Sequence, residues 1–131
     1  MMALKEVRDW LKSYGIAEHY YIGKIDNKNE KSIGVYSLER RGAPVVAIGG
    51  VVCTSYNVKA VSVLVHWTKN AAETEEAAYK LFNSILMERN LDINDKHIYF
   101  IRLLVPEPIE VGSDESGVYE RVIEFEIYYK R

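Results

Sequence analysis

Residues 58–80 read VKAVSVLVHWTKNAAETEEAAYK and contain the most clearly patterned strand and helix start of the chain. Side chains on a strand point alternately to its two faces, so residues 58–68 divide into two sets. One set contains Val61, Val63, Val65 and Trp67, and the other is more mixed. We therefore predict a strand here whose first set faces the core.

The residues after this strand predict a helix from about 71 to 88. Asn70 is suited to cap its start, and Glu73, at the third helical position, would complete a capping box. Apolar residues then recur with helical spacing, which predicts one buried face. That face contains Ala78, Leu81, Phe82, Ile85 and Leu86.

The sequence before residue 58 predicts a short helix and then two strands. Leu4, Val7, Leu11 and Tyr14 form one helical stripe, and Gly15 follows where a helix commonly ends. Residues 20–25 and 32–39 have strand character. The polar stretch between them, 26–31, favours a β-hairpin with a long loop. In the glycine-bounded stretch 40–56, residues 44–48 could form a further short strand.

The sequence after the second helix predicts two more strands. Residues 97–105 are apolar on both faces apart from Arg102, which is typical of a central strand covered on both sides. Residues 119–130 alternate, with Glu120, Glu124 and Glu126 on the outward face. Residues 106–118, rich in Pro, Gly and acids, are too long for a tight hairpin and should project from the body.

These elements predict one domain, 1–131, of the α+β class. Two helices would pack on a mostly antiparallel or mixed sheet, in the order α-β-β-(β)-β-α-β-β. The 131 residues carry 17 Lys and Arg against 19 Asp and Glu, a net charge of −2. This balance argues against a main role in coating nucleic acid or an anionic membrane. The longest apolar run is well short of the ~20 residues that cross a bilayer, so we expect a soluble cytosolic protein.

The sequence contains no pattern typical of catalysis or metal binding. Cys53 is the only cysteine, so neither an intrachain disulfide nor a zinc site built on cysteine pairs can form. Cys53 could in principle pair with His66 as a nucleophile, but a small buried thiol is the simpler interpretation. Residues 112–117 could bind a cation weakly, although a solvated loop tip explains them better. We therefore predict no catalytic, cofactor-binding or metal-binding residue.

Several segments together resemble a known family. These segments are 20–36 (YYIGKIDNKNEKSIGVY), 49–50 with 54–56, 66–67 followed by 73–78, and 104–108 continuing through Gly112, 117–120 and 128–129. They are similar to phage minor capsid proteins, which are encoded in the head–tail gene blocks of tailed phages and prophages of Gram-positive bacteria. Through this family the chain resembles the tail terminators and tail-completion proteins of siphophages.

The resemblance implies a structural protein and not an enzyme. Such proteins form a ring, typically hexameric, that stops tail-tube growth and docks the tail to the head. The expected partners are further copies of the chain, the major tail-tube protein and head connector proteins. DNA would pass through the ring without sequence-specific recognition, and neither a cofactor nor a membrane is implied. Assembly would occur in the host cytoplasm, and the product would lie at the head–tail junction of the virion.

We expect the residues that make these contacts in two long irregular segments of the chain, 40–57 and 106–118. The candidate interface residues are Arg40, Arg41, Tyr56, Glu107, Asp114 and Glu115. Three alternatives remain open from the sequence. The first is a head-completion or connector subunit. The second is a small enzyme or ligand-binding domain that uses Cys53, His66 or the tyrosines. The third is a monomeric host regulator that binds a partner through the acidic stretch 106–118.

Overall fold

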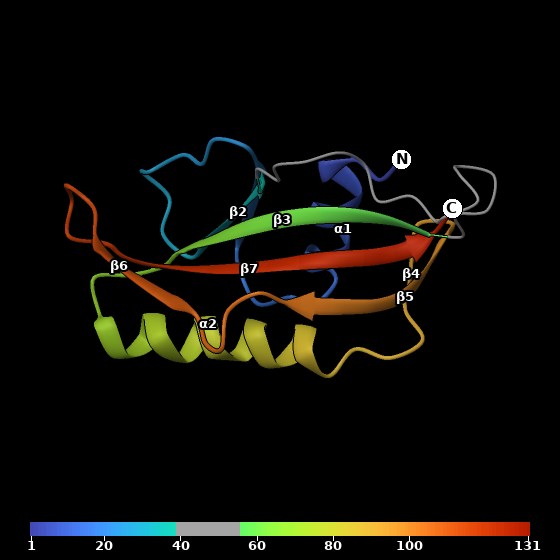
Figure 1. Cartoon of the computed structure of the whole chain (residues 1–131). Helices are drawn as coiled ribbons and strands as arrows, with labels where there is room; N and C mark the ends of the chain where they lie inside the picture. Colours follow the sequence, from blue (N-terminus) through green and yellow to red (C-terminus); the bar gives the residue numbers. More distant parts are fainter. Residues whose placement is uncertain (39–55) are drawn as a thin grey trace.

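The computed structural model of the chain describes residues 1–38 and 56–131. Within these ranges the chain forms two helices and seven strands (Figure 1). In chain order they are α1 (Leu4–Lys12), β1 (His19–Ile22), β2 (Ser32–Ser37), β3 (Tyr56–His66), α2 (Ala71–Leu86), β4 (Asp92–Ile93), β5 (Lys96–Leu103), β6 (Ile109–Ser113) and β7 (Tyr119–Lys130). The predicted strand at 44–48 lies outside the described residues, as does Cys53.

The seven strands form one sheet in the order β1-β2-β3-β7-β5-β4, and β6 also pairs with β7. The long strands β3 and β7 lie at its centre and pair over their full length, from Tyr56 opposite Lys130 to His66 opposite Glu120. All pairs are antiparallel except β1 with β2. The predicted α+β class, with two helices on a mostly antiparallel sheet, is confirmed.

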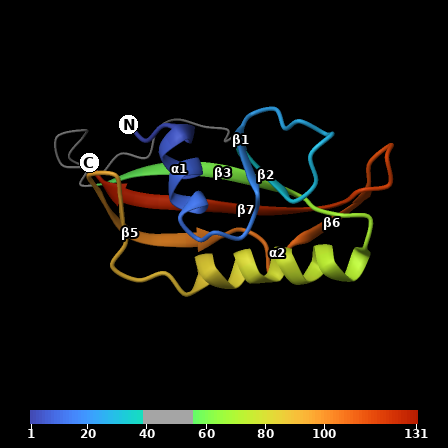
Figure 2. The same cartoon turned by 180° about the vertical axis from the view of Figure 1, so that it is seen from behind.

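Both helices cover the same face of this sheet (Figure 2). The predicted core set Val61, Val63, Val65 and Trp67 is buried there, which confirms the strand pattern. Opposite residues of β7 extend the same face, and Trp10 of α1 meets one of them, Phe125, edge to face at 6.0 Å. Burial of this contiguous apolar layer is the main force that stabilises the fold.

The predicted N-cap of α2 at Asn70 is confirmed, but the predicted return bond from Glu73 is not formed. Asn70 Oδ1 accepts hydrogen bonds from the backbone N–H groups of Ala72 and Glu73 at 3.0 and 3.1 Å. Glu73 does not return a bond to the Asn70 backbone. Its carboxylate accepts the hydroxyl of Thr68 instead, at 3.1 Å, and that hydroxyl also accepts the Asn70 N–H. The Thr68 hydroxyl thus accepts the Asn70 backbone N–H, which in a capping box the Glu73 carboxylate would accept.

The predicted hairpin between the first two strands is wrong, because β1 and β2 are parallel. Residues 23–31 cross from the end of one strand to the start of the next, with Gly23 (φ 75°) and Lys31 (φ 54°) in left-handed conformations at the two turns. Ile25 in this crossover is buried against the sheet at Gly34, where an added Cβ would lie 2.5 Å from the Ile25 Cγ2 atom. Tertiary packing of one apolar side chain therefore overrides the local hairpin signal.

The strand predicted at 97–105 is not a covered central strand. The structure has β5 at this place, and its outer side pairs only with the two-residue β4. A bulge at Tyr99 shifts the register with β7, and Tyr99 and Phe100 are both exposed. The apolar composition of β5 therefore reflects an exposed apolar edge and not double burial.

The sequence predicts a projecting loop throughout 106–118, but this stretch contains the strand β6. β6 pairs with the start of β7, with a bulge between Glu110 and Gly112, whose φ is 105°. The outward set of β7 also contains one exception. Glu126 points away from the helices but is only 5 % exposed, and it accepts the hydroxyl of Tyr128 at 3.1 Å.

Candidate functional site

The most distinctive surface feature is a hairpin made of β6, the loop 114–118 and the first residues of β7, which we call the projecting hairpin. It extends from one end of the sheet, beyond the start of α2 (Figure 1). Residues 107–124 contain six acids and one base, Arg121, so this segment of the chain is strongly acidic. A rigid acidic projection on a small domain is suited to contact a partner, because exposed charges steer and orient association.

The tip of the projecting hairpin is closed by Asp114. Its Oδ1 accepts the backbone N–H groups of Ser116 at 2.9 Å and Val118 at 3.0 Å. Gly117, with φ 85°, donates its own N–H to the Asp114 carbonyl. The loop is thus a hydrogen-bonded turn, and it presents Glu115 to solvent at its end.

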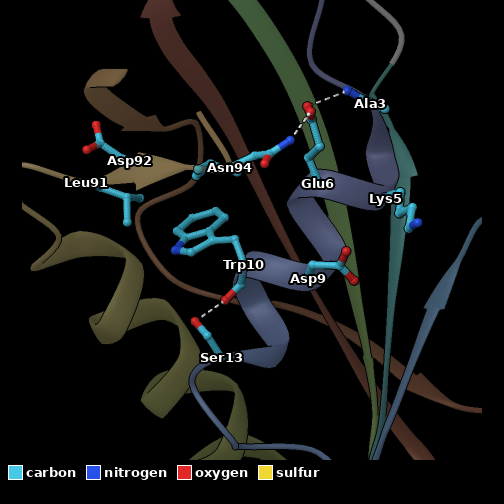
Figure 3. A pocket seen from close by; sticks show the side chains of 10 residues that line it. Ala3, Lys5, Glu6, Asp9, Trp10, Ser13, Leu91, Asp92 and Asn94 are labelled. Atoms are coloured by element: carbon cyan, nitrogen blue, oxygen red, sulfur yellow. Dashed lines mark hydrogen bonds between the residues drawn. The ribbon is translucent and has the colours of Figure 1, made fainter. Parts of the chain in front are cut away.

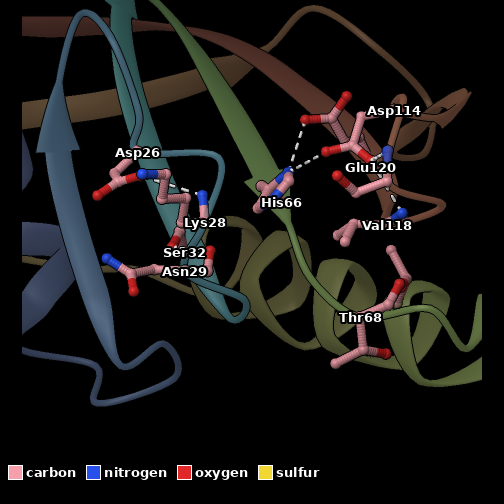
Figure 4. A network of polar contacts seen from close by, with 11 residues as sticks. Asp26, Lys28, Asn29, Ser32, His66, Thr68, Asp114, Val118 and Glu120 are labelled. Atoms are coloured by element: carbon pink, nitrogen blue, oxygen red, sulfur yellow. Dashed lines mark hydrogen bonds and ion pairs between the residues drawn. The ribbon is translucent and has the colours of Figure 1, made fainter.

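A buried histidine ties this tip to the centre of the sheet (Figure 4). His66, at the end of β3, has no exposed surface, and its Nδ1–H donates to Glu120 Oε2 at 2.9 Å. The second carboxylate oxygen of Asp114 lies 3.8 Å from the same nitrogen. The opposite ring nitrogen, Nε2, is buried and finds no hydrogen-bond partner among the described residues. One imidazole therefore links β3, β7 and the hairpin tip.

The base of the projecting hairpin is fastened to α2. The Tyr79 hydroxyl donates to Glu107 Oε2 at 2.7 Å, and this bond to a carboxylate raises the pKa of Tyr79 above its usual value. Arg121 donates to Glu75 at 3.1 Å and to the Pro108 carbonyl at 3.3 Å. The helix and the hairpin are therefore joined by charge-assisted hydrogen bonds at their seam.

The structure separates the predicted interface residues into two places. Glu107, Asp114 and Glu115 gather on or beside the projecting hairpin, whereas Tyr56 lies at the far end of β3, near Tyr128. Arg40 and Arg41 lie outside the described residues. No pattern in the sequence identified His66 and Glu120 as the anchor of the tip. Both occupy the outward positions of their strands, but only the register of β3 with β7 shows that they are opposite one another.

A second concave region lies between α1 and the β4–β5 turn and has a volume of about 710 Å³ (Figure 3). Trp10 extends from α1 toward Leu91, and Glu6 lines the other end. The Glu6 carboxylate accepts Lys96 Nζ at 2.8 Å, Asn94 Nδ2 at 3.1 Å and the Ala3 N–H at 3.0 Å. These bonds, that from Lys96 above all, lower the pKa of Glu6 to about 2. The polar groups here hold α1 against β4 and β5.

The described residues contain no group of three or more His, Cys, Asp or Glu side chains placed to bind a metal ion. The three histidines are dispersed. His19 stacks on Tyr21, His66 contacts Glu120, and His97 lies 3.0 Å from an oxygen of Asp92. The suggested pair of Cys53 with His66 cannot be placed, since Cys53 lies outside the described residues.

Comparison with known proteins adds the decisive observation. The model of a family described as bacteriophage tail terminator proteins matches residues 5–131, nearly the whole chain. The chain belongs to this family. Tail terminators are structural, non-enzymatic proteins, so this member is a tail-related structural component of a phage virion. The resemblance to tail terminators found in the sequence is thereby confirmed. A search of curated proteins finds no match to the chain. In the described part of this tail terminator, neither helix is long and apolar enough to span a membrane.

Proposed function

We propose that this protein assembles as a ring of six copies at the head-proximal end of the tail tube. The ring stops further addition of tube subunits and docks the finished tail to the head connector. The observation that carries this proposal is the match to the tail terminator family over residues 5–131. The proposed partners are other copies of the chain, the major tail-tube protein and head connector proteins.

The two ends of the sheet offer unlike surfaces for the two docking roles. At one end the projecting hairpin carries the acids Asp114 and Glu115. The other end, where β3 begins and β7 finishes, carries Lys130 and Arg131. A subunit placed between the tube and the connector needs two such distinct surfaces, and opposite charge favours distinct partners at each.

This function needs binding and positioning and no chemical step, so no cofactor is proposed. The ring would assemble in the host cytoplasm and remain in the virion at the head–tail junction. DNA would pass through its centre, with contacts that do not depend on base sequence.

Growth of tail tubes in vitro tests the proposal. Purified tail-tube protein is polymerised with and without this protein, and tube lengths and tube ends are measured by electron microscopy. We expect shorter tubes with a cap at one end, and capped tubes that bind the head connector. Tubes of unchanged length, together with binding to portal-bearing heads, would contradict the terminator role and favour a head-completion subunit.

A further inference from the structure

The exposed large apolar side chains of the described residues are concentrated along one side of the molecule. Seven of nine lie on the aligned strands β5 and β6, the segment between them, or the adjoining end of α2. They are Leu86, Met87, Tyr99, Phe100, Leu104, Ile109 and Val111, between 38 % and 70 % exposed. We call this surface the β5–β6 edge. Single exposed apolar residues are ordinary, but a contiguous row of them marks an interaction site.

The backbone along this side is open as well. β5 pairs with β7 on one side, and on the other only Lys96 and His97 pair, with β4. β6 has β7 as its one strand partner among the described residues. A hollow of about 390 Å³ lies next to this edge, and Leu86, Tyr99 and Phe100 are among the residues that line it. An apolar edge strand with unpaired backbone groups is a template for adding another strand.

The opposite edge of the same sheet is β1, which pairs only with β2 among the described residues. Its last residue, Ile22, is 40 % exposed. Because β1 is parallel to β2, it runs opposite to β5 and β6 across the antiparallel pairs of the sheet. A second copy in the same orientation would therefore bring its β1 antiparallel to β6, and the two strands have similar lengths of four and five residues.

The charges of the two edges are complementary. Residues 104–112 contain two acids, Glu107 and Glu110, and no Lys or Arg. The crossover that follows β1 presents three exposed lysines, Lys24, Lys28 and Lys31, against two acids. Of these acids, Asp26 is partly engaged, since its Oδ1 accepts the Lys28 backbone N–H at 3.0 Å. Opposite charges at matching edges favour a contact between unlike surfaces over a contact of one edge with itself.

We propose that the β5–β6 edge of one copy binds the β1 edge of the next copy, so that the sheet continues from subunit to subunit. This head-to-tail contact uses two different surfaces, and such contacts close into a ring when the rotation between copies is suitable. The inference rests on the proposed ring function and names the surfaces that build the ring.

Directed cross-linking tests which edges meet. In a Cys53→Ser background, Ile22→Cys and Val111→Cys are introduced singly and together, and each protein is treated with a short bis-maleimide. We expect a ladder of cross-linked species in the double variant and no cross-linking in either single variant. A dimer formed by the Val111→Cys variant alone would overturn the inference, because it would show two β6 edges in contact. Absence of a ladder in the double variant, while the unlabelled protein forms rings, would overturn it as well.

A charge substitution tests the energetic role of the edge. Val111→Lys places a charge in the apolar contact, whereas its matched control, Ala3→Lys, adds the same charge at an exposed position before α1, away from both edges. We expect the first variant to fold normally but to self-associate at least about tenfold more weakly, and the control to behave as the unchanged protein. Self-association is measured by light scattering over a concentration series, free and with tail tubes.

Tube capping by the unchanged protein separates failure of this inference from failure of the proposed function. If the unchanged protein caps tubes as a ring and Val111→Lys does so equally well, the edge contact is wrong and the terminator function stands. If the unchanged protein neither caps tubes nor associates with itself on them, the proposed function is wrong and the edge contact falls with it.

Discussion

His66 Nδ1 lies 2.9 Å from Glu120 Oε2, and this buried contact joins the last residue of β3 to the second residue of β7. Asp114, in the loop of the projecting hairpin, lies 3.8 Å from the same ring nitrogen. The acidic tip is therefore fixed to the two longest strands of the sheet (Figure 4). A contact surface held in this way loses little conformational entropy when a partner binds.

The two roles of Asp114 can be separated by substitution. Asp114→Ala removes the acceptor for the Ser116 and Val118 N–H groups, and we expect a loss of about 1–2 kcal/mol of stability. Asp114→Asn keeps an acceptor at Oδ1 and loses mainly the negative charge near His66, so it should cost under about 1 kcal/mol. Urea unfolding measures both, and hydrogen exchange at 114–118 reports opening of the tip. Equal losses would show that the contact with His66, and not the turn, stabilises the loop.

Reversing the charge of Glu115 should weaken docking without unfolding the protein. Glu115 is exposed at the tip, so Glu115→Lys should change stability by no more than about 0.5 kcal/mol. We expect weaker binding to one partner, the tube or the connector, and a smaller dependence of that binding on salt. Glu76→Lys, an equal charge change on an exposed residue of α2, is the control. Equal binding by both variants in tube and connector pull-down assays would exclude the tip from either contact.

Acid should weaken the attachment of α1 through Glu6. The hydrogen bond from Lys96 is the largest cause that lowers the Glu6 pKa from 4.5 to about 2 in the folded state. Since the folded pKa lies below the unfolded one, this contribution to stability is present above about pH 4.5 and is lost as the pH falls toward 2. Glu6→Gln should therefore be less stable than the unchanged protein at pH 7, and the difference should shrink between pH 4.5 and 2.

Urea unfolding of both proteins across this pH range measures the difference. Asp9→Asn, which removes a carboxylate from an exposed position of the same helix, serves as the control. A difference between Glu6→Gln and the unchanged protein that is independent of pH would mean that packing, and not ionisation, accounts for the effect.

Local sequence patterns predicted the central part of the fold because their information lies within a few residues. Alternation in 58–68 identified the buried face of β3, and Asn70 identified the start of α2. Local patterns could not predict that β1 pairs with β2 in parallel, because this pairing is accompanied by packing of Ile25 over Gly34, nine residues further along the chain. Composition also misplaced β5, since an apolar strand at an open edge resembles a covered central strand.

In the candidate site, too, local sequence predicted some residues, whereas others depend on how distant strands pair. Composition alone found Asp114 and Glu115, because an acidic glycine-containing stretch predicts a projecting turn. The anchor formed by His66 and Glu120 required the register between two strands that are more than fifty residues apart in the chain. No pattern within either strand contains that register.

The contact between Gly34 and Ile25 predicts a measurable coupling. A Cβ added at Gly34 would lie 2.5 Å from Ile25 Cγ2 and 3.0 Å from Tyr36 Cε1, so Gly34→Ala should displace the crossover and cost about 1–3 kcal/mol. Ile25→Ala alone should cost about 2–5 kcal/mol, since it empties a buried position. In the double variant the new methyl group fills space that Ile25 has vacated. The combined cost should therefore fall below the sum by about 0.5 kcal/mol or more.

Urea unfolding of the four proteins completes the cycle, and Gly34→Ala combined with Leu81→Ala is the control. Leu81 lies on α2, on the helix-covered side of the sheet, so that pair should be additive. Additivity of Gly34→Ala with Ile25→Ala would mean that the crossover does not rest on Gly34. The crossover also carries Lys24, Lys28 and Lys31, so its displacement in Gly34→Ala should weaken self-association in light scattering together with stability. If Gly34→Ala lowers stability but self-association is unchanged, the crossover does not take part in the contact between copies.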